Sequence, residues 1–186
     1  MLDTDIDSNL SSDPVVTVRI RPLALGDAAE LLEVRSRNRA HLEPWEPLRD
    51  AGFYTLAGQT AAVEAAVAVR EAGRAYPFVV EHEGRIAGGV NLNEVVRGVF
   101  QNAYLGYWID AACGGRGFAT EAVRQAVAFA FGVGGLHRVQ AAVMPRNGAS
   151  IRVLEKAGFR EEGLALRYLQ IAGVWEDHLL FAVTSD

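Results

Sequence analysis

The stretch that decides the fold, residues 107–130, reads YWIDAACGGRGFATEAVRQAVAFA. It starts with an apolar segment that ends at Asp110, passes through a glycine-rich turn at residues 114–120 and continues as an amphipathic run. This order predicts a strand, a turn and a helix. A glycine turn at a helix start leaves backbone N–H groups without partners, and the helix dipole adds partial positive charge. We therefore predict that this turn binds a phosphate group of a ligand.

A purely structural role for these glycines is the alternative, because glycine also serves tight turns and close packing. Their spacing argues against two common nucleotide-binding loops. The sequence contains no GxxxxGK[ST] pattern, and Gly115-Arg116-Gly117 lacks the third glycine of a dinucleotide-binding loop. NTP and NAD are therefore disfavoured as ligands.

Length and composition predict one folded domain. The chain has 186 residues, half of them hydrophobic, which is enough for a sizeable core. We expect a disordered tail at residues 1–14 and a single domain at residues 15–186. Residues 1–13 are acidic and polar, and no apolar run reaches about 18 residues, so neither a signal peptide nor a membrane span is predicted. A cytoplasmic location follows from this interpretation.

The net charge and the single cysteine argue against several partners and kinds of site. The net charge of −5 disfavours nucleic acid as a direct partner; it suits a basic protein or peptide, or simply a soluble acidic surface. Cys113 excludes an internal disulfide and a thiolate metal cluster, and without a flanking His or Asn it is interpreted as a turn residue rather than a nucleophile. His41, His82 and His137 show no metal-ligand spacing, so no metal site is expected.

Periodicity predicts the other elements. Strands are expected at residues 15–21, 77–81, 86–96, 103–109, 137–143, 159–169 and 174–183, the last two joined by a turn at Ala172-Gly173. Helices are expected from the cap Asp27 to about His41, at residues 59–72 and 117–131, and from the cap Asn147 to Gly158. This order predicts a mixed sheet covered by helices.

Three details of this layout bear on the site. Pro44 and Pro47 are expected to force an extended loop that carries Trp45 and Glu46. Gly88-Gly89 inside a strand indicates a bulge or a close backbone approach. Trp108 and Trp175 are expected in the core.

Several segments carry a resemblance to a known family. YWID at residues 107–110, GRGFATEA at 115–122, NGAS at 147–150 and KAGF at 156–159 resemble the acetyl-CoA signature of GCN5-related N-acetyltransferases (GNAT). The resemblance covers nearly the whole chain after the tail. HLEPWEP at 41–47, NEVVRG at 93–98, LHRV at 136–139 and GVWEDH at 173–178 are most similar to the RimJ/RimL group, the bacterial ribosomal-protein-alanine N-acetyltransferases.

This resemblance implies an α/β (α+β) fold of GNAT type, with a mixed, mostly antiparallel central sheet that is splayed in the middle and flanked by helices. It implies acetyl-CoA as cofactor and CoA as product, with the pantetheine lying along the opened sheet edge like an extra strand. Ile109 is then expected to offer backbone hydrogen bonds near the thioester, and Asn147 to position the cofactor. The implied pyrophosphate site comprises Gly114, Gly115, Arg116, Gly117, Phe118, Ala119 and Thr120, with Arg116 as counter-charge or, alternatively, solvated. The family usually has Gln or Arg where this chain has Gly114, a change expected to alter affinity modestly.

The implied chemistry is direct attack of a neutral amine on the thioester in a ternary complex. An N-terminal α-amine has a reference pKa of about 7.7–8.0 against about 10.4 for lysine, so deprotonating lysine at neutral pH costs roughly 3–4 kcal/mol more. An enzyme acting on an α-amine therefore needs only a weak base or a water chain.

The acid and base are assigned from the residues available. Many superfamily members place a tyrosine one turn after Ser150 as the acid, but this chain has Leu154 there, so Ser150 is assigned that role. The alternative is that Asn147 and Ser150 only cap the helix. Glu46, Glu94 and Asp177 are the candidate bases, with Glu46 favoured because an apolar cleft beside Trp45 would raise its pKa.

The remaining substrate assignments are also expectations. Glu46 could instead bind the ammonium group of the substrate, Glu94 could be a surface residue, and Asp177 and His178 could form a structural pair. We expect Trp45, Glu46, Glu94, Arg97 and Tyr107 to contact the acceptor.

Three functions are compatible with the sequence. The first is acetylation of a protein N-terminal α-amine, with the N-terminal alanine of a ribosomal protein as the expected acceptor. The second is acetylation of a small amine such as an antibiotic, amino sugar or polyamine. The third is a non-catalytic regulator that binds acyl-CoA. Either a monomer or a homodimer is compatible with the sequence.

Overall fold

The computed structural model describes residues 17–185, and the predicted tail at residues 1–14 lies outside this range. Within these residues, seven strands form one sheet in the order β1-β2-β3-β4-β5-β7-β6. Every neighbouring pair is antiparallel except β4 and β5, which are parallel. The strands are β1 (Arg19–Pro22), β2 (Tyr76–His82), β3 (Arg85–Val96), β4 (Asn102–Ile109), β5 (Arg138–Val143), β6 (Arg160–Ile171) and β7 (Val174–Thr184). The predicted fold class is confirmed.

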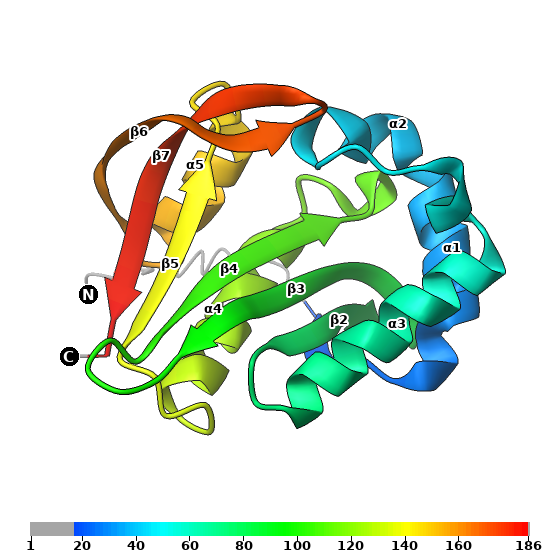
Figure 1. Cartoon of the computed structure of the whole chain (residues 1–186), viewed down its shortest axis with the longest axis horizontal. Coiled ribbons are helices and arrows are strands. Elements are labelled where there is room, and N and C mark those ends of the chain that lie inside the picture. The colour runs from blue at the N-terminus through cyan, green and yellow to red at the C-terminus, as the bar shows by residue number, and fades with distance from the viewer. Residues whose placement is uncertain (1–16, 186) are drawn as a thin grey trace, which may run out of the picture.

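Helices cover both faces of this sheet (Figure 1). They are α1 (Ala28–Arg37), α2 (Arg39–Leu42), α3 (Leu56–Glu71), α4 (Phe118–Phe131) and α5 (Gly148–Lys156). Short 3-10 turns lie at Leu25–Asp27, Glu43–Trp45, Ala51–Tyr54 and Ala111–Cys113. Helices α1 and α3 pack on one face of β2 and β3, whereas α4 and α5 lie on the opposite face.

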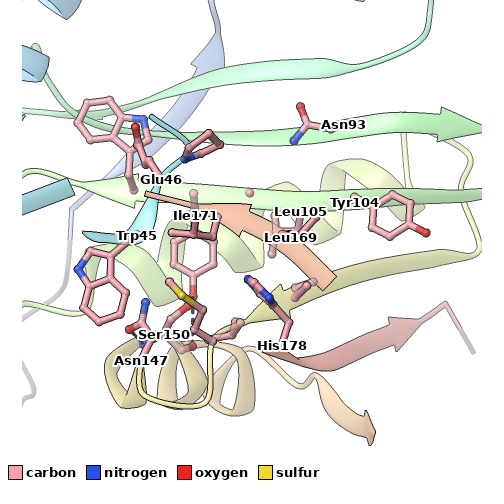
Figure 2. A pocket seen from close by; sticks show the side chains of 18 of the residues that line it. Trp45, Glu46, Asn93, Tyr104, Leu105, Asn147, Ser150, Leu169, Ile171 and His178 are labelled. Atoms are coloured by element: carbon pink, nitrogen blue, oxygen red, sulfur yellow. Dashed lines mark hydrogen bonds between the residues drawn. The ribbon is translucent and has the colours of Figure 1, made fainter. Parts of the chain in front are cut away.

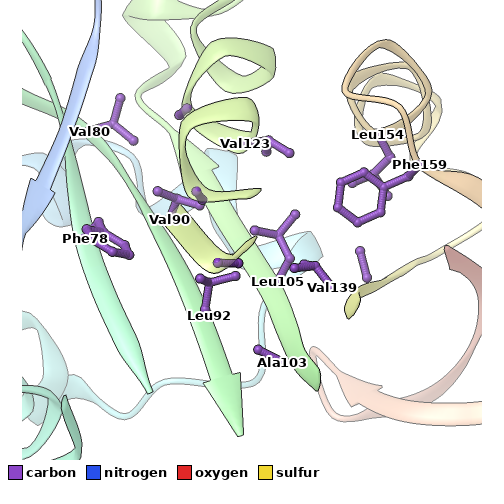
Figure 3. Packing of buried hydrophobic residues seen from close by; sticks show 14 of the residues in the cluster. Phe78, Val80, Val90, Leu92, Ala103, Leu105, Val123, Val139, Leu154 and Phe159 are labelled. Carbon is purple, nitrogen blue, oxygen red and sulfur yellow. The ribbon is translucent and has the colours of Figure 1, made fainter. Parts of the chain in front are cut away.

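Each face has its own hydrophobic cluster. The larger cluster joins α4 to the middle of the sheet, where Val123 packs with Val90, Leu92 and Leu105 (Figure 3). Buried residues of α4 recur at helical spacing at Phe118, Ala122, Val123, Ala126 and Ala130. Burying this stripe orients α4 so that its N-terminus meets the end of β4.

Strands β4 and β5 pair over three residues and then separate. Their partners are Asn102 with Arg138, Ala103 with Val139, and Tyr104 with Gln140. Beyond Tyr104, β4 stays on β3 as far as Ile109, while β5 follows β7 as far as Val143. The predicted splay in the middle of the sheet is therefore confirmed (Figure 1).

The free edge of β4 follows from strand alternation. The N–H of Asp110 donates to the carbonyl of Ala87 at 2.8 Å, so it points toward β3. Backbone groups alternate in direction along a strand, so those of Ile109 and Tyr107 point into the gap on the other side. Main-chain donors and acceptors are thus available along the opened edge.

Gly88 and Gly89 permit the close approach of β3 to Trp108. A Cβ added at Gly88 would lie 2.3 Å from the carbonyl oxygen of Trp108, and one at Gly89 would lie 2.6 Å from its Nε1. The expected close backbone approach is confirmed. The register also shifts opposite Val80 and Glu81, so a β-bulge lies next to these glycines.

Four local expectations are wrong. The helix predicted to reach His41 is interrupted at Asn38, which turns its amide toward Asp110. The Asp27 carboxylate does not cap α1; it accepts the N–H of Ala24 at 2.8 Å and pairs with Arg21.

The loop after α2 and the environment of Trp175 also differ from expectation. Residues Glu43–Trp45 form a 3-10 turn rather than an extended segment, because Pro44 lies in its first turn, where no N–H is needed. Trp175 is 59% exposed rather than part of the core, since it lies close to the β6–β7 turn.

Candidate functional site

A cavity of about 710 Å³ opens where β4 and β5 separate (Figure 2). One wall is the free edge of β4, and the opposite wall is formed by the end of β5 and the start of α5. The β6–β7 hairpin and the segment after α2 close the remaining sides. Its walls include most of the acceptor and catalytic residues expected from the sequence: Trp45, Glu46, Glu94, Tyr107 and Ser150. Asn147, expected to position the cofactor, lines it too.

The start of α5 brings two hydroxyl groups together. Asn147 caps the helix as predicted, because its Oδ1 accepts the N–H of Ser150 at 3.1 Å. The Ser150 hydroxyl lies 2.7 Å from that of Tyr107 on β4, and the two share a hydrogen bond. Burial raises the pKa of Tyr107 to about 12, so this phenol is protonated at neutral pH. Leu154 is fully buried in the core and takes no part.

Glu46 lies in the cavity but is already ion-paired. Its carboxylate lies 2.5 Å from the guanidinium of Arg35 and 3.9 Å from that of Arg49. Arg35 also stacks over the ring of Trp108 at 4.0 Å. Burial lowers the pKa of Arg35, although the charge of Glu46 opposes this effect. A proton-accepting role for Glu46 would require this half-buried ion pair to open.

Glu94 reaches the cavity through an irregularity in β3. The register of β3 on β4 shifts between Asn93 and Val96, and Glu94 has a left-handed φ of 50°. It lines the same wall as Tyr104 and Tyr168. Burial, together with nearby Tyr104 and the negative charge of Glu94, raises the pKa of Tyr168.

Arg97 lies away from the cavity. Its guanidinium donates to the carbonyl of Gly134 at 2.7 Å and to the hydroxyl of Tyr76 at 2.9 Å. These contacts tie the end of β3 to the turn after α4. The structure therefore places Arg97 as a support for that turn and not on the acceptor wall.

The glycine turn presents the start of α4 to solvent. Gly117 occupies the N-cap position with a φ of 80°, and no side chain caps the helix. The first N–H groups of a helix have no intrahelical partner, so those of Phe118, Ala119 and Thr120 are available to an anion. Gly115 also has a positive φ, of 73°, and its missing side chain leaves open space. This backbone geometry fits a phosphate group.

The other residues of the turn contribute differently. The N–H of Gly114 donates to the carbonyl of Ala111 at 3.1 Å, so it is used within the turn. Arg116 is exposed, with its guanidinium 4.6 Å from the centre of the Phe118 ring. Burial, with the nearby charge of Asp110, raises the pKa of the Cys113 thiol, which disfavours a nucleophilic thiolate.

A buried carboxylate anchors this turn, and the sequence analysis did not identify it. Asp110 accepts hydrogen bonds from Arg37 Nε at 3.0 Å, Asn38 Nδ2 at 3.0 Å and the Ala112 N–H at 3.1 Å. The Asn38 Oδ1 in turn accepts the N–H of Ala111 at 2.9 Å. Burial alone would raise the pKa of Asp110, but these hydrogen bonds outweigh it and hold the pKa below its usual value. The interruption between α1 and α2 therefore serves to position the phosphate-binding turn.

Within residues 17–185, no group of three or more His, Cys, Asp or Glu side chains is placed to hold a metal ion. No helix in the same range is long and apolar enough to cross a membrane.

A splayed mixed sheet, a free β4 edge and an uncapped helix start that can hold a phosphate are the features expected of an acyl-CoA-dependent acyltransferase. The family described as "Acetyltransferase (GNAT) domain" matches residues 17–160. The chain therefore belongs to the GNAT family and is an acetyltransferase that uses acetyl-CoA.

Its relatives include ribosomal-protein acetyltransferases. The chain is 42% identical to the probable N-acetyltransferase YjcK of Bacillus subtilis, covering 90% of this chain and 93% of that one. It is 37% identical to the [ribosomal protein uS5]-alanine N-acetyltransferase of Escherichia coli, covering 86% and 83%. The structure of Mycobacterium smegmatis RimJ in complex with CoA-disulfide has a TM-score of 0.87 at 37% identity, covering 90% and 82%. The resemblance to the RimJ/RimL group is confirmed.

The Asp110 anchor predicts a pH-dependent stability. A carboxylate whose pKa is lowered on folding stabilises the fold above its unfolded pKa of about 3.9, and this contribution is lost as pH falls through the folded value. Asp110→Asn should lower the free energy of unfolding by about 1–3 kcal/mol at pH 7, because Arg37 loses its charged partner. The measurement is urea denaturation of both proteins from pH 7 to pH 3, over which the difference should shrink.

Asp50→Asn is the matched control, because that exposed carboxylate accepts only a local hydrogen bond from Phe53. Its effect at pH 7 should be the smaller of the two. A difference for Asp110→Asn that stays constant down to pH 3 would show that its charge is not the stabilising feature.

Proposed function

We propose that this enzyme transfers the acetyl group of acetyl-CoA to the α-amine at the N-terminus of a protein, with the N-terminal alanine of a ribosomal protein as acceptor. The observation that carries this proposal is the similarity over most of both chains to an enzyme named for alanine acetylation of ribosomal protein uS5. The cavity supports it, because its hydroxyls, carboxylates and aromatic rings surround the free edge of β4. The cytoplasm is the proposed place of action.

The cofactor site that we propose uses main-chain groups. The N–H groups at the start of α4 hold the pyrophosphate, with Gly115 and Gly117 allowing its close approach and Arg116 adding positive charge. The backbone of Ile109 and Tyr107 offers strand-like hydrogen bonds along the opened edge. Acetyl-CoA supplies the acetyl group as an activated thioester.

The acceptor side is proposed to lie between the segment after α2 and the β6–β7 hairpin. Trp45 forms an apolar part of this wall, and Glu94 gives it negative charge, while the charge of Glu46 is balanced by Arg35. A positively charged N-terminus is attracted to such a wall before it loses its proton. Because Glu46 is held by Arg35, we assign it to positioning rather than to proton transfer.

The Ser150 and Tyr107 hydroxyls are the proposed proton donors to the leaving thiolate. Ser150 lies at the α5 end of the cavity, and the protonated phenol of Tyr107 stands behind it at 2.7 Å. This pair replaces the tyrosine acid that many superfamily members have at the position of Leu154. Here the tyrosine comes from β4 and not from α5.

Small amines are the competing acceptors, and one assay distinguishes acetylation of a protein N-terminus from acetylation of a small amine. Thiol release is measured with acetyl-CoA and short peptides that begin with Ala, Ser or Met, alongside a panel of amino sugars, aminoglycosides and polyamines. We expect a higher kcat/KM for the Ala peptide than for any small amine. Turnover of small amines alone would refute protein acetylation, and binding of CoA without any turnover would contradict the acceptor chemistry proposed for this site.

The phosphate-binding turn makes a sharp prediction. Gly117→Glu should abolish binding of CoA, because it places a carboxylate against the proposed pyrophosphate site and strains a left-handed backbone position. Gly117→Asn is the matched control, since asparagine tolerates that conformation without adding charge. Isothermal titration calorimetry with CoA measures both, and the Asn variant should retain most of the affinity. Equal binding by the Glu variant would remove this turn from the site.

The hydroxyl pair predicts coupled effects on turnover. Ser150→Ala should lower kcat by about 10- to 100-fold and raise the KM for acetyl-CoA much less, because its hydroxyl acts in proton transfer. Tyr107→Phe should cause a smaller loss, and the double variant should lose less than the product of the two. Ser36→Ala, on the exposed side of α1, is the control. Unchanged kcat for Ser150→Ala would leave Ser150 as a helix-start residue only.

A further inference from the structure

His178 on β7 is the buried titratable residue of the cavity that the proposed mechanism has not used. It is 3% exposed and lines the cavity between the β6–β7 hairpin and the start of α5. Figure 2 shows its ring on the same side of the cavity as Ser150 and Leu169. The sequence suggested a structural pair of Asp177 and His178, but their side chains diverge. The Asp177 carboxylate accepts the N–H of Arg167 at 2.8 Å instead.

The backbone determines which nitrogen of His178 carries the proton. Its Nδ1 lies 2.9 Å from the carbonyl oxygen of Glu176, and a carbonyl can only accept. Nδ1 must therefore be the donor, which leaves Nε2 of the neutral imidazole as a hydrogen-bond acceptor. The ring keeps the same hydrogen bond after it takes up a second proton, because Nδ1 remains a donor in the imidazolium.

The acceptor nitrogen is open to the cavity. Within residues 17–185, the side-chain polar atoms that are both buried and unpartnered belong to Gln101, Asn102 and Gln140, so Nε2 is not sealed in the core. The structure pairs Nε2 with no other group of that range. The nearest ring is that of Tyr168, whose centre is 5.9 Å away. Nε2 can therefore accept a hydrogen bond from an N–H group of a substrate that enters the cavity.

The neighbouring carboxylates are engaged elsewhere. Glu46 is paired with Arg35, Glu176 with Arg146 at 2.8 Å, and Asp177 with the Arg167 backbone. The titratable and charged groups that line the cavity with His178 are Tyr168 on β6, Tyr104 and Tyr107 on β4, Glu94 on β3, Arg35 on α1, and Glu46 and Arg49 on the segment after α2. The Arg146–Glu176 pair joins β7 to the segment before α5. Glu46 lies between Arg35 and Arg49, Glu176 pairs with Arg146, and Glu94 is a third carboxylate, so the three arginines are matched in number and the region does not repel an ammonium group.

We propose that His178 is the catalytic base, taking a proton from the acceptor's ammonium group at Nε2; this inference rests on the proposed function. The freed amine forms the C–N bond as the C–S bond of the thioester breaks. One proton of the ammonium group passes to His178 and then to solvent. The attacking nitrogen loses a second proton when the C–N bond forms. That loss is balanced by the proton that Ser150 and Tyr107 deliver to the sulfur of CoA. The net products are the acetylated amine, the thiol of CoA and one proton.

His178→Asn tests this role, because the Asn amide can still donate to the Glu176 carbonyl while the titrating acceptor is lost. The value of kcat/KM for an Ala peptide is measured from pH 6.5 to pH 9. We expect a loss of about 100-fold at pH 6.5 that shrinks to less than about 5-fold at pH 9, since solvent then deprotonates an α-amine of pKa about 7.7–8.0. His137→Asn is the control and should match the wild type, because His137 contacts Ser185 near the end of the chain.

Two further measurements separate a catalytic from a structural role. Calorimetry with CoA and thermal unfolding should show that His178→Asn binds and folds like the wild type. A loss that is equal at every pH, or no loss at pH 6.5, overturns the proposal. Failure of the proposed function appears earlier and separately, as a wild-type enzyme that prefers small amines; the same pH series is then run with the best amine.

Discussion

The separation of β4 from β5 after Tyr104 is the constraint on which the site depends. Strand β4 is held to β3 through Ile109 and by the hydrogen bond from Asp110 to Ala87, whereas β5 is paired with β7 along its whole length. Neither strand can approach the other again without losing its own ladder. Main-chain groups at a sheet edge need partners, so the opened edge of β4 favours a ligand that can hydrogen-bond like a strand. The gap also provides the volume into which Tyr107 and Ser150 project.

The phosphate-binding turn depends on a second constraint, the buried carboxylate of Asp110. Because this residue ends β4 and begins the turn, its bonds to Arg37 and Asn38 fix the direction in which the chain leaves the sheet. The same bonds explain why the first helix is interrupted at Asn38. An uncapped helix start is useful to an anionic ligand only if it is held still, and this network holds it. Packing of Phe118 against the core supports the turn from the other side.

Patterns local in sequence were predictable, and contacts distant in sequence were not. The α4 helix, the Asn147 cap and the order of strands follow from periodicity and turn residues, and the splay follows from the family resemblance. The Asp110–Asn38 bond joins residues 72 positions apart, and no spacing signals it. Glu46 could be recognised as a polar residue beside an aromatic one, but its ion pair with Arg35 depends on how α1 packs. The buried Asp110 after an apolar strand is the one signal that could have been noticed.

The identity of the base illustrates the same limit. From the sequence, a carboxylate in an apolar cleft is the natural choice, because burial can bring its pKa toward neutrality. In the structure the favoured carboxylate is paired with Arg35, so it is not free to meet an incoming ammonium group. An α-amine loses its proton near pH 8, so the base needs above all to be oriented toward the acceptor. His178 meets this requirement through geometry alone, because one backbone carbonyl orients the ring and leaves its other nitrogen facing the cavity.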